Sequence, residues 1–241
     1  QLKFRRPRAL LQGQRSDSPL KINKVMTVPT PDGGAYLAWE DNRNGAENTD
    51  IFVQRLDNNG SQLWQQGGIA VATAPGDQSV PKLMPRRDGV LVAWNDRRNG
   101  TDDNLYMQFF DWRGTSQWTT GGKPLCTARR SQSSLKFVPS FQDTAFAIWT
   151  DTRALYASGF DLYMQKISPE GEAVWNKNGS ALTSARGYQT AAQLVPRIDG
   201  GFVEAWMDER AGKYNIYLAG RTPKGKKLRG AVDGAVSPSR V

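Results

Sequence analysis

Histidine is absent from this 241-residue sequence, and cysteine occurs once, at Cys126. A single cysteine excludes a disulfide within the chain, and the lack of histidine removes the usual ligand sets of zinc and copper. Nucleophilic catalysis by a Ser/His/Asp or Cys/His arrangement is excluded as well. No segment approaches the ~20 consecutive apolar residues of a transmembrane helix, and no secretory leader is visible. We therefore expect no metal, no cofactor and no transmembrane segment.

Acidic residues are fewer than basic ones, which gives a formal net charge of +9. A charge of this sign favours anionic partners such as an acidic protein, an acidic glycan or nucleic acid. Glycine, proline and aromatic residues are plentiful, and the apolar runs are short and separated by turn signals. This composition predicts an all-β fold.

The strongest pattern is a Trp-x-Asp-x-Arg motif that returns four times. Successive tryptophans are 55, 55 and 57 residues apart, and the copies are Trp39, Asp41 and Arg43; Trp94, Asp96 and Arg98; Trp149, Asp151 and Arg153; and Trp206, Asp208 and Arg210. An aromatic residue, a turn glycine and a second tryptophan follow in the same phase, although the fourth copy has Leu228 in place of that tryptophan. The chain is therefore a repeat protein.

Each copy contains four short strand candidates, which in the second copy we expect at roughly 80–85, 90–95, 104–111 and 123–127. An Asp-Gly signal such as Asp88-Gly89 predicts a compact turn between the first two strands. The third copy has Gln142-Asp143-Thr144 instead, which predicts another turn type. The second strand is apolar at successive positions, and this favours burial on both faces of its sheet.

Four-stranded units with both faces covered are what a β-propeller requires. We expect four blades of four antiparallel strands in one propeller of residues 9–230, after a basic N-terminal arm at 1–8 and before a C-terminal tail at 231–241. The fourth copy lacks a last strand, whereas residues 9–13 align with the last strand of the other copies. We expect this N-terminal strand to close the ring, because closure removes exposed sheet edges.

The consensus Asp-Gly-x-x-x-Ala-Trp-x-Asp-x-Arg-x-Gly, followed by Asp-Ile/Leu-Tyr-x-Gln and then Gly and Trp, resembles the propeller repeats of secreted and surface proteins of Bacteroidota-like bacteria. Its Asp-x-Arg-x-Gly core is similar to TolB-type repeats, although the helical domain that precedes the TolB propeller is missing. The resemblance covers residues 9 to about 230. It implies an exported, noncatalytic interaction platform in the periplasm, at the cell surface or outside the cell, with no shared catalytic residue.

The repeated Asp-x-Arg invites comparison with the carboxylates of five-bladed glycosidases. Four equal copies favour a structural role instead, because catalysis needs one asymmetric site. We expect each aspartate to accept backbone N–H groups of the following turn and each arginine to pair with a carboxylate of the next blade. Both tryptophan series are expected to pack between blades. The loops at 41–45 and 57–60 lack the spaced acidic ligands of a calcium loop, so Asx turns are expected there.

Positions that break the repeat are the best indicators of function. Glu204 occupies the place of Leu37, Val92 and Ala147, where an unpaired buried carboxylate would be costly. It is a candidate channel site if it faces the propeller axis, and otherwise we expect it to pair with an arginine or lysine. A lone carboxylate does not supply the pair that glycoside hydrolysis needs. Trp112 in a turn and Tyr156 in an enlarged loop are candidate partner-binding residues.

Arginines gather on the rim that carries the connections between blades. The candidate partner-binding residues there are Arg15, Arg97, Arg98, Arg129, Arg130 and Arg186. We expect this rim to bind another protein with an acidic surface, because arginine forms forked pairs with carboxylates. The expected function is a noncatalytic assembly subunit or scaffold of the bacterial cell envelope, as part of an outer-membrane or secretion complex, and not an enzyme. The alternatives are a carbohydrate-binding, lectin-like propeller and a glycosidase. Nucleic acid is not expected, because no helix is available to enter a groove.

Overall fold

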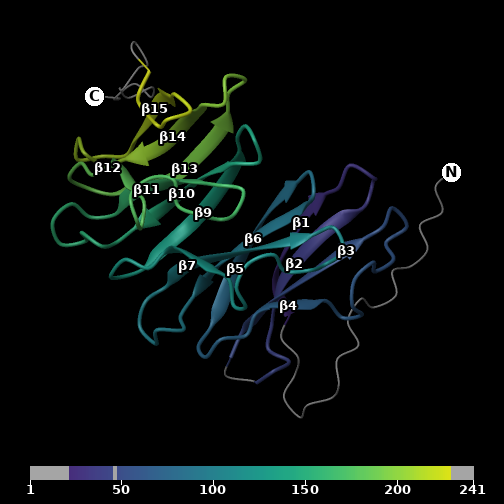
Figure 1. Cartoon of the computed structure of the whole chain (residues 1–241). Coiled ribbons are helices and arrows are strands. Elements are labelled where there is room, and N and C mark those ends of the chain that lie inside the picture. Colours follow the sequence, from purple (N-terminus) through teal and green to yellow (C-terminus); the bar gives the residue numbers. More distant parts are fainter. Residues whose placement is uncertain (1–21, 46–47, 229–241) are drawn as a thin grey trace. The chain divides into compact units, whose positions relative to one another are not determined.

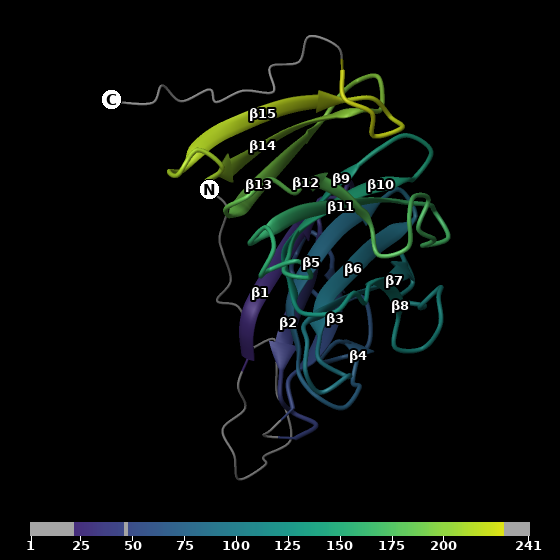
Figure 2. The ribbon, with the colours of Figure 1, turned by 90° about the vertical axis from the view of Figure 1, so that its left-hand side faces the viewer.

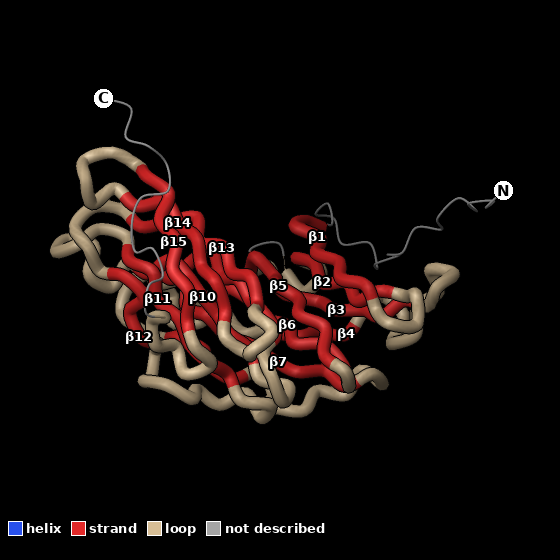
Figure 3. Tube along the Cα trace, turned by 90° about the horizontal axis from the view of Figure 1, so that it is seen from above, coloured by secondary structure: helices blue, strands red, loops and turns tan. Residues whose placement is uncertain are grey.

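The computed structural model describes residues 22–45 and 48–228, which form strands and loops without a helix (Figure 3). Within these described residues, fifteen strands build four antiparallel sheets, three of four strands and one of three (Figure 1). No helix in the described part of the chain could cross a membrane. The all-β prediction is confirmed.

The strands follow one another through every sheet in sequence order. The first sheet contains β1 (Ile22–Pro29), β2 (Ala35–Asp41), β3 (Asp50–Leu56) and β4 (Ile69–Ala72). The second contains β5 (Gln78–Arg86), β6 (Gly89–Asp96), β7 (Asn104–Asp111) and β8 (Lys123–Cys126). The third contains β9 (Gln132–Pro139), β10 (Ala145–Asp151), β11 (Asp161–Ile167) and β12 (Ser180–Thr183). The fourth contains β13 (Gln189–Pro196), β14 (Phe202–Asp208) and β15 (Asn215–Arg221).

The strand predictions for the second copy are confirmed, with ends that differ by at most two residues from β5 to β8. The turn of the third copy is of another type, as expected. Gln142 and Asp143 both have positive φ, at 56° and 55°, whereas the first and fourth copies place a glycine, Gly33 and Gly200, in the left-handed region. Two successive left-handed residues are typical of a type I′ hairpin turn.

The first strand of every sheet contains the same irregularity. In each of these strands, one residue that is not glycine has a φ between 44° and 56°. The pairing with the second strand shifts at this residue. The four residues are Lys24, Val80, Ser134 and Ala191. A left-handed backbone at such residues costs free energy and persists only where the surroundings impose it. The repeat thus imposes a β-bulge at one fixed place in its first strand.

The chain divides into two compact units, one of Gln1–Gly100 with Met107–Gly122 and the other of Thr101–Tyr106 with Lys123–Val241. The first unit contains the first sheet, β5, β6 and most of β7. The second unit contains β8 together with the third and fourth sheets.

Burial on both faces is confirmed for the middle sheets, because every residue of β6 and β10 is buried. For β14 this expectation is wrong. There the burial alternates, and Figure 2 shows β13, β14 and β15 side by side as one curved sheet. The buried face of β14 packs in the core of the second unit, where the rings of Phe146 and Phe202 lie 4.6 Å apart. Its other face leaves Met207 and, on β15, Ile216 partly exposed.

Three expectations fall outside the described residues: the basic arm at 1–8, the closing strand at 9–13 with Arg15, and the tail at 231–241. The fourth sheet has three strands within the described segments, and its outer edge at β15 has no fourth strand there. Closure of the ring stays a prediction.

Candidate functional site

The Trp-x-Asp-x-Arg motif forms the same cluster at the end of the second strand in all four sheets. Each indole N–H donates to the aspartate two residues later over 2.7–3.1 Å. The other oxygen of each aspartate accepts the backbone N–H of the arginine over 2.8–2.9 Å, which fixes the following turn. The structural role expected for the aspartates is confirmed.

The arginine of the motif pairs with a carboxylate of its own sheet and not with one of the next sheet, so that expectation is wrong. Each guanidinium folds back on the aspartate two residues earlier. In the first three sheets it also donates to a carbonyl of the loop before the outer strand, that of Gly67, Gly121 or Asn178. One side chain therefore ties the second strand to the outer strand of its own sheet.

These contacts favour the charged form of Asp41 and Asp208 although both side chains are buried. Burial would raise the pKa of Asp41, but the hydrogen bonds from Arg43 and Trp39 outweigh it and lower the pKa below its usual value. Asp208 has a lowered pKa for the same reasons, with Arg210 and Trp206 as the donors. Since all four aspartates have no exposed surface, they cannot contact a substrate.

In two sheets a second carboxylate lies opposite the aspartate of the Trp-x-Asp-x-Arg motif, which we call the capping aspartate. Asp50 lies opposite Asp41, and Asp161 lies opposite Asp151. Burial raises the pKa of Asp50 and of Asp161, although Asn44 donates to the first and Ser158 to the second. A pair of neighbouring carboxylates is an arrangement that acid–base catalysis uses. Both pairs are nonetheless buried, so their position identifies them as parts of the core.

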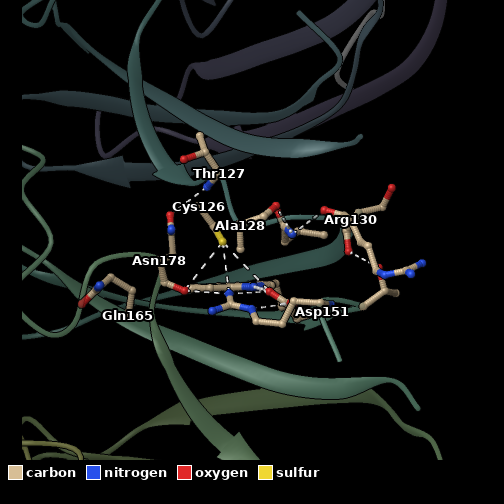
Figure 4. Close-up of polar contacts among 12 residues, drawn as sticks. Cys126, Thr127, Ala128, Arg130, Asp151, Gln165 and Asn178 are labelled. Atoms are coloured by element: carbon tan, nitrogen blue, oxygen red, sulfur yellow. Dashed lines mark hydrogen bonds and ion pairs between the residues drawn. The ribbon is translucent and has the colours of Figure 1, made fainter. Parts of the chain in front are cut away.

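Cys126 lies beside the cluster of the third sheet (Figure 4). Its sulfur accepts a hydrogen bond from Arg153 Nη2 at 3.3 Å and lies 3.6 Å from the carbonyl oxygen of Asn178. The Asn178 side chain in turn accepts the backbone N–H of Thr127. Burial raises the pKa of the Cys126 thiol to about 11, so it is not a nucleophile at neutral pH.

Glu204 has no exposed surface and is paired with Arg221, whose Nε lies 2.7 Å from Glu204 Oε1. The second of the two expected environments is therefore the observed one. Arg221 also donates to the carbonyls of Gly225 and Leu182, which places it between the third and fourth sheets. This pair replaces apolar residues of the other copies and is the largest break in the repeat.

Three loops of the second unit each have an exposed tyrosine, Tyr156, Tyr188 and Tyr214, and we call these three residues the tyrosine rim. Their exposed fractions are 88%, 42% and 47%. Hydrogen bonds join neighbouring loops here: Thr152 donates to the carbonyl of Ser131, the backbone N–H of Glu209 donates to the carbonyl of Tyr188, and the backbone N–H of Tyr188 donates to the Glu209 carboxylate. This tyrosine rim is a surface of the kind that stacks on ligand rings.

The predicted arginines and aromatics of the described residues divide between the two units. Arg130 lies 4.3 Å over the Tyr156 ring, so these two belong to the tyrosine rim. Arg129, Arg186 and Arg97 are exposed, whereas Arg98 belongs to the buried cluster of the second sheet. Trp112 is half exposed in the turn after β7, at the opposite end of the strands, and its carbonyl accepts from Arg55 and Trp64.

Sequence reasoning missed Glu40, which is almost fully buried at the end of β2. Its carboxylate accepts the backbone N–H of Val80 at 2.7 Å and lies 3.4 Å from the ammonium of Lys24. Both partners are the left-handed residues of first-strand bulges. The signal was available, since Glu40 stands where the other copies have Asn95, Thr150 and Met207. Across 22–45 and 48–228, no group of three or more His, Cys, Asp or Glu residues could hold a metal ion.

No protein-family model matches the chain, and no curated protein matches it. Solved structures do. The α-L-arabinanase of Penicillium chrysogenum, complexed with arabinobiose, has a TM-score of 0.56 at 12% identity over 88% of this chain and 67% of its own. An endo-1,4-β-xylanase of Bacteroides thetaiotaomicron has a TM-score of 0.52 at 7% identity over 87% and 72%. The endo-arabinase of the same organism has a TM-score of 0.50 at 12% identity over 89% and 80%.

At these identities the similarity shows the fold, an antiparallel all-β fold of the kind found in β-propeller glycosidases. The expectation of a noncatalytic scaffold is corrected, because solved structures that share the fold include arabinan-degrading glycoside hydrolases. The expectation that the chain is not an enzyme is corrected on the same ground. The narrower resemblance to TolB-type and surface-protein repeats has no support from these comparisons.

Proposed function

We propose that the chain is a glycoside hydrolase acting on a pentose polysaccharide of the arabinan or xylan type. The observation that carries the proposal is the fold, which aligns over 88% of the chain with an arabinanase and over 87% with a xylanase. The absence of histidine agrees with this chemistry, because glycoside hydrolysis uses carboxylates rather than imidazole. The alternative of glycan hydrolysis therefore replaces the scaffold.

Glu40 is the carboxylate best placed to take part in such a reaction. It breaks the repeat, and it lies against the bulges of two first strands, which in a propeller line the central channel. Both of its contacts come from donors, a backbone N–H and an ammonium group. In this proposal Glu40 supplies one of the two carboxylates that glycoside hydrolysis uses, the one that acts as base or nucleophile.

The test is hydrolysis of arabinan and xylan by the purified chain, measured as new reducing ends. Glu40→Gln should lower the rate by at least about 100-fold, because a general base or nucleophile is lost while the acceptor for the Val80 N–H remains. Glu170→Gln, in the exposed turn after β11, is the matched control and should keep full activity. A wild-type chain that hydrolyses none of these glycans contradicts the proposal.

Carbohydrate binding without hydrolysis is the second candidate, and the tyrosine rim favours it. Exposed rings in adjoining loops can stack on sugar faces whether or not a bond is cleaved. Retention of the chain by immobilised arabinan or xylan without release of reducing ends would decide for this candidate. Tyr156→Ala should weaken that retention, whereas Trp112→Ala should leave it unchanged.

We also propose that the four sheets are the blades of a closed propeller and that residues 9–13 supply the outer strand of the fourth. The support is the missing fourth strand at β15 within the described residues, together with the alignment of 9–13 to the outer strands of the other copies. Deleting residues 1–14 should lower the melting temperature and promote oligomers, because an uncovered edge pairs with other chains. An unchanged melting curve would exclude this closure. An acidic protein partner for the arginine rim and an exported location stay predictions.

A further inference from the structure

A cavity of about 520 Å³ opens in the second unit between the outer part of the third sheet and the turn after β15. Trp175, Asn176 and Ser180 line one side, and Arg221, Lys224 and Lys226 line the other. Its volume falls within the range of about 300–1,000 Å³ that small-ligand sites occupy. Neither Glu40 nor the tyrosine rim contributes to it.

The equivalent place one repeat earlier is filled. There Lys123, at the start of β8, pairs with the carboxylate of Glu172 and donates to the carbonyl of Glu170 at 2.9 Å. In the later copy Ser180 stands in the place of Lys123, and Lys224 and Lys226 stand in the places of Glu170 and Glu172. The long side chain that bridges the gap is lost, and the facing turn changes from acidic to basic.

Arg221, which is paired with the buried Glu204, lines this cavity. Arg221 replaces the buried Ile167 of the third sheet and donates to the Gly225 carbonyl at 3.0 Å, which fixes the turn that carries the two lysines. Because Glu204 neutralises its charge, Arg221 acts as a positioning residue. The free positive charge of the cavity comes from Lys224 and Lys226.

The walls offer a ring and hydrogen-bonding groups. Trp175 is half-buried, and an edge of its indole lies against Gly225, where an added Cβ would stand 2.7 Å from the ring. Asn176 and Ser180 bond to each other at 3.2 Å. Lys224 and Lys226 are exposed and have no acidic partner among the described residues. An aromatic edge, an amide, a hydroxyl and two ammonium groups suit a hydroxylated ring that carries a carboxylate.

We propose that this cavity binds a sugar residue bearing a carboxylate, that is, a uronic acid within a glycan. The inference rests on the proposed function for its choice of a sugar and adds an acidic residue to the recognised glycan. The lysines hold the carboxylate, and Asn176 and Ser180 meet the ring hydroxyls.

Isothermal titration calorimetry with a galacturonic acid trisaccharide tests the proposal, and the methyl ester of the same trisaccharide is the control ligand. The acid should bind at least about tenfold more tightly than the ester, and the difference should shrink as salt is raised to about 1 M. Lys224→Gln combined with Lys226→Gln should remove the preference. Lys123→Gln is the matched control and should preserve it.

Equal binding of acid and ester, or a preference that survives the double lysine variant, overturns the inference. Inorganic phosphate added as a competitor distinguishes a site for any anion: displacement of the trisaccharide by phosphate at equal concentration would overturn the assignment to a sugar. Hydrolysis of arabinan or xylan is measured on the same preparations. Hydrolysis without acid binding removes this inference alone, and acid binding without hydrolysis removes the proposed function alone.

Discussion

The third and fourth sheets are copies of one repeat within one compact unit, yet they differ in what surrounds their common cluster. Both have the Trp-x-Asp-x-Arg cluster with nearly equal hydrogen bonds. In the third sheet Ala147 and Ile167 are buried apolar residues, whereas the fourth has Glu204 and Arg221 at the same positions. The comparison separates residues that the repeat needs from residues that it merely accommodates.

The turn after the third strand also differs between the two sheets, because its side chains are acidic in the third sheet and basic in the fourth. Glu170 and Glu172 of the third sheet face Lys123, whereas Lys224 and Lys226 of the fourth face Ser180 and a cavity. A buried ion pair and an open basic cavity therefore occur together in one copy. Since a buried ion pair is rarely the most stable choice, its presence beside the cavity favours a role in binding.

The largest expected effect lies in what the two sheets share. Trp149→Ala and Trp206→Ala should each lower the free energy of unfolding by about 3–5 kcal/mol, because both indoles are buried and both bond to the capping aspartate. Chemical denaturation of each variant measures this. A much smaller loss for Trp206→Ala would show that the fourth sheet is held less firmly than the third.

The next effect concerns Glu204 and Arg221, the ion pair that distinguishes the fourth sheet from the third. Glu204→Leu alone should cost on the order of 3 kcal/mol, because it leaves the largely buried Arg221 without its carboxylate. Glu204→Leu combined with Arg221→Leu copies Leu37 and Leu56 of the first sheet and should recover most of that loss. The comparison of the single and double variants in denaturation curves measures the coupling. If the double variant is as unstable as the single, the pair is needed for folding rather than for the cavity.

The sequence was sufficient to predict the repeat, the strands and the capping aspartates, because each depends on local pattern. It was not sufficient for the partner of Arg43 and its counterparts, since both a neighbouring blade and the aspartate two residues earlier are within reach of that side chain. The left-handed residues of the first strands, such as Val80, have no local signal either. They follow from pairing between distant segments.

Of the candidate sites, the sequence identified Glu204 as an exception and proposed an arginine or lysine as its partner. It could not identify Arg221, which occupies an apolar position of the repeat. Glu40 and the cavity were missed for a different reason. Their signals were present as breaks in the repeat at Glu40, Lys224 and Lys226, but only the structure shows what these residues face.

A smaller effect should follow from giving the turn of the third sheet, and the residue that faces it, the side chains found one repeat later. Lys123→Ser combined with Glu170→Lys and Glu172→Lys copies Ser180, Lys224 and Lys226 onto the third sheet. Stability should change by no more than about 1 kcal/mol, because Glu172 is largely exposed and surface ion pairs contribute little. Calorimetry with the galacturonic acid trisaccharide should show at most weak extra binding, since Ile167 cannot hold the turn as Arg221 does. A second site of full affinity would show that the lysines suffice without the ion pair.

The smallest expected effect concerns Cys126 and Thr183, which lie beside the motif arginines Arg153 and Arg210. Cys126 accepts a hydrogen bond from Arg153, and Thr183 accepts one from Arg210 at 3.2 Å, so a thiol and a hydroxyl perform the same task in successive copies. Cys126→Thr should therefore change stability by about 1 kcal/mol or less.

The thiol itself should resist iodoacetamide at pH 8 in the folded chain, because burial raises its pKa to about 11, and it should react at once in denaturant. As pH rises toward that value the folded state still disfavours the thiolate, so stability should fall more steeply on the alkaline side in the wild type than in Cys126→Thr. Tyr36 and Tyr163, whose pKa values burial also raises, contribute equally to the fall in both proteins. Rapid alkylation of the native chain, or equal alkaline stability of the two proteins, would contradict this account of the sulfur.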